Sequence, residues 1–280
     1  MEPSFLDDRA IIAISGPEAR DFLQGLVTND VKALTPGWGL YTALLSPQGK
    51  VLFDFLVTQG DGALLLDVAG KSRDSLLKKL RTYRLRSKVE IEERPQLGVY
   101  LDLEGHPENR PLRYLDRAIS FVDPRLAALG VRSIGSKAEM PDNLAGPHSY
   151  HQRRLELGVP EANDFGHEKI FALDAGLEEL NGVSFQKGCY IGQELTSRMK
   201  HRASARKRIL TVSAETALPA QGTPIMRNGM EIGELLSTYD CRGFAVVRLD
   251  RLQETQGELR AGEIVVALKQ PAWLASPHGE

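Results

Sequence analysis

The sequence is poor in cysteine. Its 280 residues contain two, Cys189 and Cys241, which excludes a disulfide framework. A closed zinc or iron–sulfur site typically needs about four ligands, and the chain has no C-x-x-C pair. We therefore expect no private metal site or cluster. A cluster shared with a partner, to which this chain lends one thiolate, is compatible with the count.

Strong net charge and long apolar runs are also lacking. The net charge is −2, so no overall field favours nucleic acid or membrane. No uncharged apolar run reaches the roughly 18 residues of a membrane-spanning helix. The opening MEPSFLDDRA has neither an apolar signal core nor transit-peptide character. We expect a reduced cytoplasmic setting, with both thiols free and no membrane partner.

Recognised catalytic fingerprints are absent as well. The sequence has no nucleophile elbow, phosphate loop or dinucleotide motif, so a known catalytic triad is not supported. What it does have is a helix pattern over 19–27, and strand patterns joined by a turn at 59–62. After about residue 205 the pattern is all-β, with a hairpin turn at Asn228 and Gly229. Strands interrupted by single helices favour α+β layers, and the tail favours a small barrel.

The stretch FQKGCYIGQEL (185–195) surrounds Cys189 with glycines at 188 and 192. In an extended segment Lys187 would share a side with Cys189, and a nearby ammonium favours a thiolate. A helix beginning in QELTSRMKHR would place its N-terminus close to the thiol. From these residues alone, chemistry and simple packing are equally supported.

Two basic stretches, 78–88 and 198–208, allow three interpretations: a solvated helix face, a nucleic-acid surface, or a pocket for an anionic small molecule. No nucleic-acid motif accompanies them, so direct nucleic-acid binding is not expected. In YHQRRLELG, Tyr150 and Glu156 suit a heteroaromatic ring with N–H donors. Pairing of Glu156 with Arg153 or Arg154 is the equally supported alternative.

KGCYIGQE (187–194) resembles the signature of the YgfZ family, folate-binding relatives of the glycine-cleavage aminomethyltransferase. Further blocks agree in order: FLQGLVTNDV, LLSPQGKVLFDFLV, YRLRSKVEI, RRLELGVPE and LEELNGVSFQKGCYIGQELTSR. The resemblance implies an α+β, aminomethyltransferase (GcvT)-like ring of two α+β domains and a small C-terminal β-barrel around a central folate opening. It implies a split domain of residues 1–46 with 145–204, an inserted domain of 47–144, and a barrel of 205–280.

The resemblance also implies a function. Members of that family act as accessory factors in assembly or repair of iron–sulfur proteins, including radical-SAM and aconitase-like enzymes. They are linked to tetrahydrofolate, to A-type cluster carriers and to cluster-dependent tRNA modification. A non-catalytic assembly factor is the first expectation. A folate-dependent aminomethyltransferase or demethylase, with Asp74 or Glu156 as its acid, is the first alternative, and an RNA-binding module is the second.

Individual site residues follow from the same resemblance. Cys189 is the functional thiol and Lys187 its activator, and the thiol would work beside the folate pocket. Glu156 falls where aminomethyltransferases have a pterin-contacting acid in a leucine–glutamate–alanine–glycine pattern, although Leu157 here replaces the alanine. The remaining expected folate contacts are Asn29, Tyr150, Arg153, Tyr190, Gln193, Glu194 and Arg198. Trp38 and Trp273 do not match the tryptophans that line the folate site in some members.

Overall fold

A five-stranded antiparallel sheet in the order β3-β4-β5-β2-β6 forms the first layer of the computed structural model. The model describes residues 3–105, 118–139, 144–166, 168–201, 207–254 and 256–275. The strands of this sheet are β2 (Arg9–Ser15), β3 (Leu40–Leu45), β4 (Val51–Gly60), β5 (Ala63–Ala69) and β6 (Glu90–Glu93). The predicted hairpin joins β4 to β5 through Asp61 and Gly62, both with positive φ, as a two-residue turn of this kind requires.

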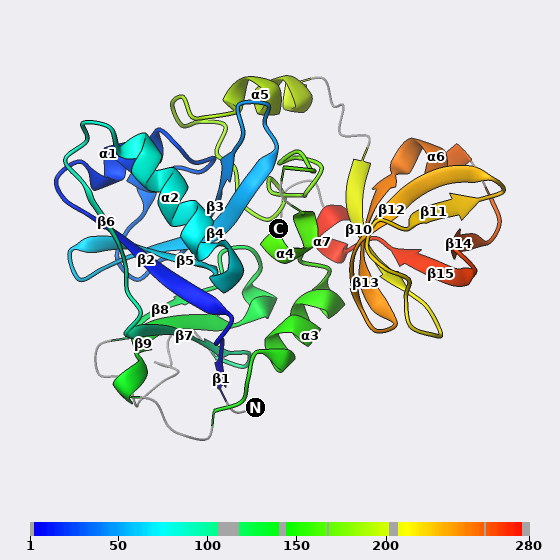
Figure 1. Cartoon of the computed structure of the whole chain (residues 1–280), viewed down its shortest axis with the longest axis horizontal. Coiled ribbons are helices and arrows are strands. Elements are labelled where there is room, and N and C mark those ends of the chain that lie inside the picture. The colour runs from blue at the N-terminus through cyan, green and yellow to red at the C-terminus, as the bar shows by residue number, and fades with distance from the viewer. Residues whose placement is uncertain are drawn as a thin grey trace.

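Helices α1 (Ala19–Gln24) and α2 (Arg73–Arg84) cover one face of this sheet (Figure 1). Alternation along β2 explains the arrangement, because Ile12 and Ile14 point toward the helices while Ile11 and Ala13 point to the opposite face. Leu76 and Leu80 of α2, one turn apart, are buried against the helix-side cluster. The helix predicted over 19–27 is present as α1, but it ends earlier, at Gln24.

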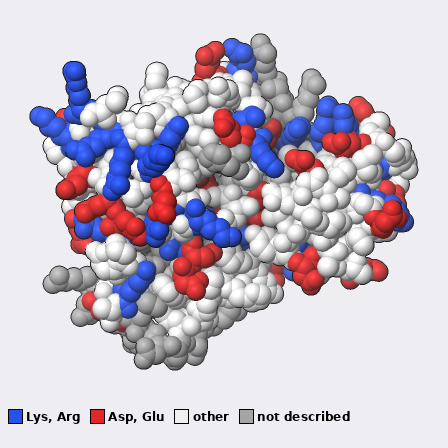
Figure 2. Space-filling view, in the orientation of Figure 1, with Lys and Arg blue, Asp and Glu red and all other residues white. Residues whose placement is uncertain are grey.

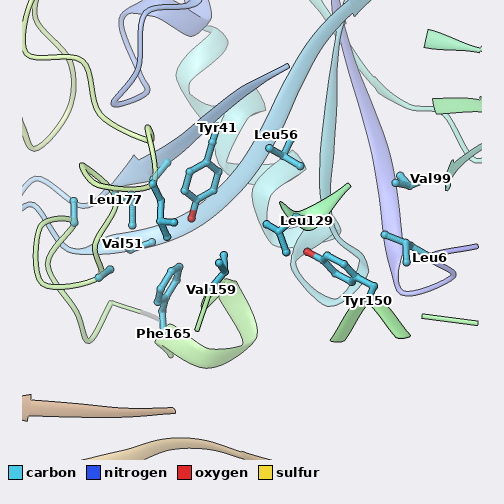
Figure 3. Close-up of a cluster of buried hydrophobic side chains, with 14 of the residues drawn as sticks. Leu6, Tyr41, Val51, Leu56, Val99, Leu129, Tyr150, Val159, Phe165 and Leu177 are labelled. Carbon is cyan, nitrogen blue, oxygen red and sulfur yellow. The ribbon is translucent and has the colours of Figure 1, made fainter. Parts of the chain in front are cut away.

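A second, four-stranded sheet in the order β1-β7-β9-β8 lies on the other face. Its strands are β1 (Ser4–Phe5), β7 (Leu97–Asp102), β8 (Ile119–Val122) and β9 (Val131–Ser136). The two sheets share one core with α3 (His148–Leu157) and α4 (Ala162–Phe165). Figure 3 shows part of this core, where Tyr41, Tyr150 and Phe165 lie among buried aliphatic side chains.

The expected boundary between residues 46 and 47 falls inside the five-stranded sheet, between the paired strands β3 and β4. Of the loop-rich crossing near 142–149, residues 142 and 143 lie outside the described part of the chain. The division of the chain into three domains stays a prediction.

The C-terminal strands form a closed six-stranded barrel in the order β10-β13-β12-β11-β14-β15, seen at the right of Figure 1. The strands are β10 (Lys207–Ser213), β11 (Pro224–Arg227), β12 (Met230–Tyr239), β13 (Arg242–Arg248), β14 (Leu259–Ala261) and β15 (Ile264–Lys269). Helix α6 (Leu249–Glu254) follows β13, and α7 (Ala272–Ala275) returns toward α3, where Trp273 Nε1 donates to the Leu157 carbonyl at 3.0 Å. The predicted small barrel and its hairpin at Asn228 and Gly229 are confirmed.

Candidate functional site

Cys189 lies in an exposed turn that leads into α5 (Gln193–His201). The turn depends on Gly192, whose φ is +81°. A Cβ at this position would come within 2.6 Å of the Ser46 carbonyl oxygen and 3.1 Å of Gly49 Cα. Only glycine permits this contact between the Cys189 turn and the β3–β4 turn. The backbone after the thiol is therefore packed tightly while the thiol itself faces solvent.

Lys187 anchors the other side of the same turn. Its side chain is buried, and Nζ donates to the carbonyl oxygens of Gln24 at 2.7 Å, Val27 at 2.5 Å and Asn29 at 2.9 Å. An ammonium group has three N–H donors, so these carbonyls use all of them. Burial lowers the pKa of Lys187 to about 8. The predicted role of Lys187 as activator of Cys189 does not fit this geometry, because its donors are directed into the protein.

Lys187→Met tests the anchoring role. The variant keeps the apolar stem but leaves three carbonyls without a donor, so we expect a loss of about 2 kcal/mol in the free energy of unfolding. Alkylation of Cys189 by iodoacetamide at fixed pH should stay within about twofold of wild type or become faster. Lys200→Met is the control, since Lys200 is exposed. A rate that falls tenfold or more would restore Lys187 as the activator.

The expected folate contacts do not converge. Tyr150 is fully buried, and Glu156 is exposed on α3, where Oε1 accepts from Gln152 Nε2 at 3.4 Å. Arg153 is half-buried on the same helix. Asn29 is buried away from α3. It lines a cavity of 470 Å³ together with Tyr41 and the segment 183–186.

The signature residues after Cys189 are likewise divided. Tyr190 is buried with its ring 5.1 Å from Lys187 Nζ, and Gln193 is half-buried. Glu194 and Arg198 form a 3.0 Å ion pair on the exposed side of α5. Asp74, the acid considered for one-carbon transfer, is exposed and paired with Arg73 at 2.9 Å. None of these groups meets Glu156 in a common site among the described residues.

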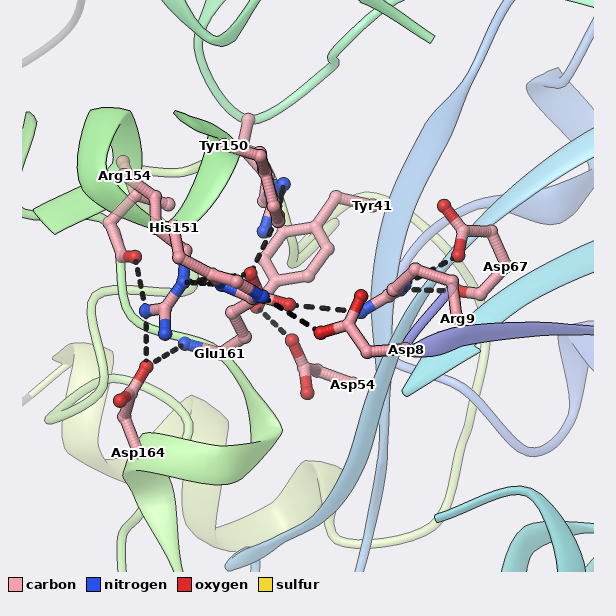
Figure 4. A network of polar contacts seen from close by, with 12 residues as sticks. Asp8, Arg9, Tyr41, Asp54, Asp67, Tyr150, His151, Arg154, Glu161 and Asp164 are labelled. Carbon is pink, nitrogen blue, oxygen red and sulfur yellow. Dashed lines mark hydrogen bonds and ion pairs between the residues drawn. The ribbon is translucent and has the colours of Figure 1, made fainter. Parts of the chain in front are cut away.

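Tyr150 belongs to a buried network of charged and hydrogen-bonding side chains, shown in Figure 4. Its hydroxyl donates to Glu161 Oε1 at 2.6 Å and accepts from Arg125 Nη2 at 2.9 Å. Arg9 bridges Glu161 at 2.9 Å and Asp67 at 2.6 Å. The hydroxyl is thus engaged by protein groups, and the assignment of Tyr150 to a ligand pocket stays a prediction.

The network continues in both directions from this centre. Arg132 Nη1 contacts Asp67 at 2.6 Å, and its Nε contacts Asp123 at 2.8 Å. On the other side Arg154 Nη1 contacts Asp164 at 2.6 Å, and Tyr239 OH of the barrel lies 3.0 Å from Asp164. Buried carboxylates are acceptable only when paired in this way. The network therefore joins both sheets, α3 and the barrel.

Two acids of the buried network have pKa values shifted in opposite directions, because burial raises the pKa of a carboxyl group and a paired arginine lowers it. Burial opposes ionisation of Asp123, but Arg125 and Arg132 lower its pKa to about 2. Burial, followed by the charge of Glu161, raises the pKa of Asp54 to about 6. Asp54 Oδ2 accepts from Tyr41 OH at 3.0 Å, while its Oδ1 has no partner among the described residues. Asp54 is thus the network's most readily protonated acid among those with a resolved shift.

A second buried acid, Asp174, lines a cavity of 310 Å³ between α5 and the barrel. Its Oδ1 has no hydrogen-bond partner among the described residues, and burial raises the pKa of its carboxyl group to about 6. Three other charged residues line the cavity, Lys169, Lys207 and Glu234. The remaining lining residues are apolar: Ile170, Phe171, Leu195, Met199 and Val246. A buried carboxyl group with an unpaired oxygen, at the wall of a cavity, can serve a ligand that carries N–H donors.

Asp174 was not among the residues expected at the site. Leu173, Asp174, Ala175 and Gly176 also resemble the leucine–glutamate–alanine–glycine pattern of aminomethyltransferases, with aspartate in place of the glutamate. The stretch around Glu156 keeps the glutamate but has leucine in place of the alanine. The pattern therefore does not distinguish the two acids, whereas the structure places Asp174 at a cavity and Glu156 on the surface.

Two family descriptions match the chain: the GCVT N-terminal domain over residues 9–112 and the CAF17 C-terminal β-barrel domain over 206–276. Among curated proteins, the mitochondrial iron–sulfur cluster assembly factor IBA57 of Homo sapiens is 32% identical, over 96% of this chain and 84% of its own length. The Mus musculus protein of that name is also 32% identical, over 89% and 78%. The chain belongs to the IBA57 family.

A solved structure agrees on the fold. The glycine-cleavage aminomethyltransferase T of Bartonella henselae matches with a TM-score of 0.73 over 97% of this chain and 85% of that chain, at 15% identity. The predicted aminomethyltransferase-like fold is confirmed. The resemblance to GcvT-like proteins of iron–sulfur assembly is also confirmed, with IBA57 as the relatives found.

The expected cytoplasmic location is wrong. The IBA57 relatives of mouse, Neurospora crassa and human are all named as mitochondrial proteins. The expectation rested on two free cysteines, on an opening segment without signal or transit character, and on the lack of a long apolar run. These features exclude a disulfide framework but do not distinguish one reducing compartment from another.

Proposed function

We propose that this IBA57-family chain assists assembly of iron–sulfur proteins by lending the Cys189 thiolate to a cluster held jointly with a partner protein. The observation that carries the proposal is an exposed thiol on a turn anchored by Lys187 on one side and Gly192 on the other. Among the described residues, no three His, Cys, Asp or Glu side chains gather to hold a metal ion. The other ligands would therefore come from the partner.

The kind of partner follows from the lack of further metal ligands near Cys189 among the described residues. A thiolate is a soft ligand suited to iron–sulfur clusters, and the Cys189 proton leaves when the sulfur binds iron. A-type carriers, which bring a cluster with their own thiolates, are the proposed partners, and radical-SAM and aconitase-like enzymes are the proposed clients. In a strain lacking this gene, reintroducing the chain should restore the activities of such enzymes. Unchanged activities in the deletion strain would count against the proposal.

Tetrahydrofolate is the proposed ligand of the Asp174 cavity. Its reduced ring carries amino and ring N–H donors that the Asp174 carboxylate can accept, and its glutamate tail suits Lys169 and Lys207. When bound, the group would supply a heterocycle able to carry one carbon unit. Leu195 and Met199 of α5 line the same cavity, so the helix that follows Cys189 would pack against the ligand.

Asp174→Asn tests the cavity. Titration calorimetry with tetrahydrofolate should show affinity at least about tenfold weaker, because a charged acceptor is lost. Glu156→Gln is the matched control and should bind as wild type does. If only the Glu156 variant loses affinity, tetrahydrofolate binds at α3, and its assignment to the Asp174 cavity is wrong.

The same variant should change stability with pH. The pKa of Asp174 is raised to about 6 in the folded chain, so between its ordinary value and about 6 the folded state binds more protons than the unfolded state. Ionised Asp174 therefore destabilises the fold above about pH 6. We expect Asp174→Asn to raise the unfolding midpoint at pH 8, with a gain that shrinks as pH falls through about 6. A gain independent of pH would contradict a buried, ionised Asp174.

A further inference from the structure

The turn after α2 holds a leucine in a backbone conformation that normally requires glycine. Leu85 has φ +44° and ψ −108°, and Ser87 N donates to the Arg84 carbonyl at 2.8 Å. This is a type II′ turn with Leu85 at the first central position, where glycine is favoured. The other non-glycine residues with positive φ in the described part of the chain are Asp, Glu or Asn. A leucine here is strained.

The strained residue is also the most exposed of the large apolar side chains recorded among the described residues. Leu85 is 88% exposed, so its burial does not offset the strain. Local packing gives no reason for a leucine in place of glycine. A strained backbone conformation that no packing within the chain compensates is often found at a site that binds a ligand or partner.

Cations surround this leucine. We define the leucine tip as Arg84, Leu85, Arg86 and Lys88, all exposed at or just after the carboxyl end of α2. No acidic side chain pairs with its three cations in the described part of the chain. Figure 2 shows the Lys and Arg side chains gathered over this end of the molecule, at the upper left.

Few acids oppose them. Lys78 and Arg81 are further exposed cations on α2 itself, while Glu18 and Glu90 are the acids next to the tip in contact or in sequence. Glu18 Oε2 already accepts the Lys88 backbone N–H at 3.0 Å, and Glu18 lines a shallow 690 Å³ depression with Leu85, Arg86 and Ser87. The local balance is therefore positive although the whole chain carries −2.

We propose that the leucine tip docks this protein on an anionic membrane surface, with Leu85 entering the headgroup layer and the cations contacting lipid phosphates. A protruding apolar side chain flanked by Arg is suited to that boundary. Nucleic acid would use the cations but has no use for an exposed leucine, since stacking on bases needs an aromatic ring. No helix in the described residues is long and apolar enough to cross a membrane, and surface docking requires none.

The expectation of no membrane partner rested on the small net charge and on the lack of a membrane-spanning apolar run. Attraction to a charged surface falls off within a Debye length, about 10 Å, so a local cluster acts regardless of distant acids. The leucine tip is a feature of folded backbone geometry, which overall composition does not report.

Sedimentation with lipid vesicles tests the proposal, using the full chain and vesicles of phosphatidylcholine with or without phosphatidylglycerol. We expect binding only to the anionic vesicles, weakening as salt rises. Arg84→Glu with Arg86→Glu should weaken binding at least about tenfold. The control is Arg242→Glu with Lys269→Glu, two exposed barrel cations, and it should bind as wild type does.

Variants at Leu85 separate docking from folding. Leu85→Gly should abolish vesicle binding while raising the unfolding midpoint by about 2 °C, because glycine relieves the turn. Leu85→Ser removes the apolar group without relieving the turn, and should lose binding without gaining stability. Leu85→Met should keep both properties of wild type. Proteins with intact Cys189 should all support cluster assembly in vesicle-free solution, which separates this proposal from the assembly function.

Several results would overturn the proposal. These are equal binding to both vesicle types, binding that survives Arg84→Glu with Arg86→Glu, or a Leu85→Gly variant that still binds. Retention on an RNA oligonucleotide, with no vesicle binding, would assign the same surface to nucleic acid instead.

Discussion

Cys189→Ser should abolish the chain's ability to restore iron–sulfur enzyme activities in a deletion strain. A serine hydroxyl is a poor ligand for cluster iron, whereas a thiolate binds it well. The side chain is exposed, so the substitution should leave folding unchanged. We expect client activities at the level of the deletion strain, with an unfolding midpoint equal to that of wild type.

Cys241→Ser provides the matched control. Cys241 is the other free thiol, half-buried in the turn between β12 and β13 of the barrel. This variant should complement fully. Complementation by Cys189→Ser at the wild-type level would remove the thiol from the proposed function.

Arg132→Met should produce the largest loss of stability among these variants. Arg132 is fully buried, contacts Asp67 and Asp123, and places its guanidinium 4.9 Å from the Tyr150 ring. Removing one partner leaves buried carboxylates incompletely paired, which costs about 3–5 kcal/mol. We expect the unfolding midpoint to fall by roughly 10 °C, measured by thermal unfolding at pH 7.

An exposed arginine calibrates that effect. Arg260 pairs with Glu258 at 2.6 Å, with about half of each side chain exposed. Arg260→Met should leave the midpoint nearly unchanged, since exposed ion pairs contribute little. Equal effects of the two substitutions would mean that the buried network does not hold the sheets and the barrel together.

Local features of the fold could be predicted from the sequence because their causes are local. Asp61–Gly62 and Asn228–Gly229 form two-residue hairpin turns whose backbone these residues favour. The apolar face of α1 was visible in the spacing of its apolar residues.

The buried network could not be predicted in this way. Arg9 pairs with Glu161 across 152 positions, and Arg132 pairs with Asp67 across 65. Lys187 Nζ donates to carbonyls at and just after the end of α1, across about 160 positions. Such contacts are set by topology rather than by neighbouring residues. Lys187 was therefore assigned to Cys189, its neighbour in sequence.

The candidate site was predicted in part. Cys189 was identified from the family signature, and the structure places it in the open. Glu156 was chosen because it falls where aminomethyltransferases have a pterin-contacting acid, and Tyr150 was expected to join it at the ligand. A helix, however, directs side chains at different positions to different sides. Tyr150 consequently lies in the core while Glu156 lies in solvent. The cavity at Asp174 is lined by residues of α5, of the barrel and of the segment 169–174, and no local pattern describes how these come together.

The most direct test of the account is the visible circular dichroism spectrum of the complex formed with a cluster-loaded A-type carrier. If Cys189 binds cluster iron, mixing wild-type chain with the loaded carrier should yield a complex whose spectrum differs from that of the carrier alone. Cys241→Ser should reproduce that spectrum, and Cys189→Ser should leave the carrier's own spectrum unchanged. A Cys189→Ser complex with the wild-type spectrum would contradict the account.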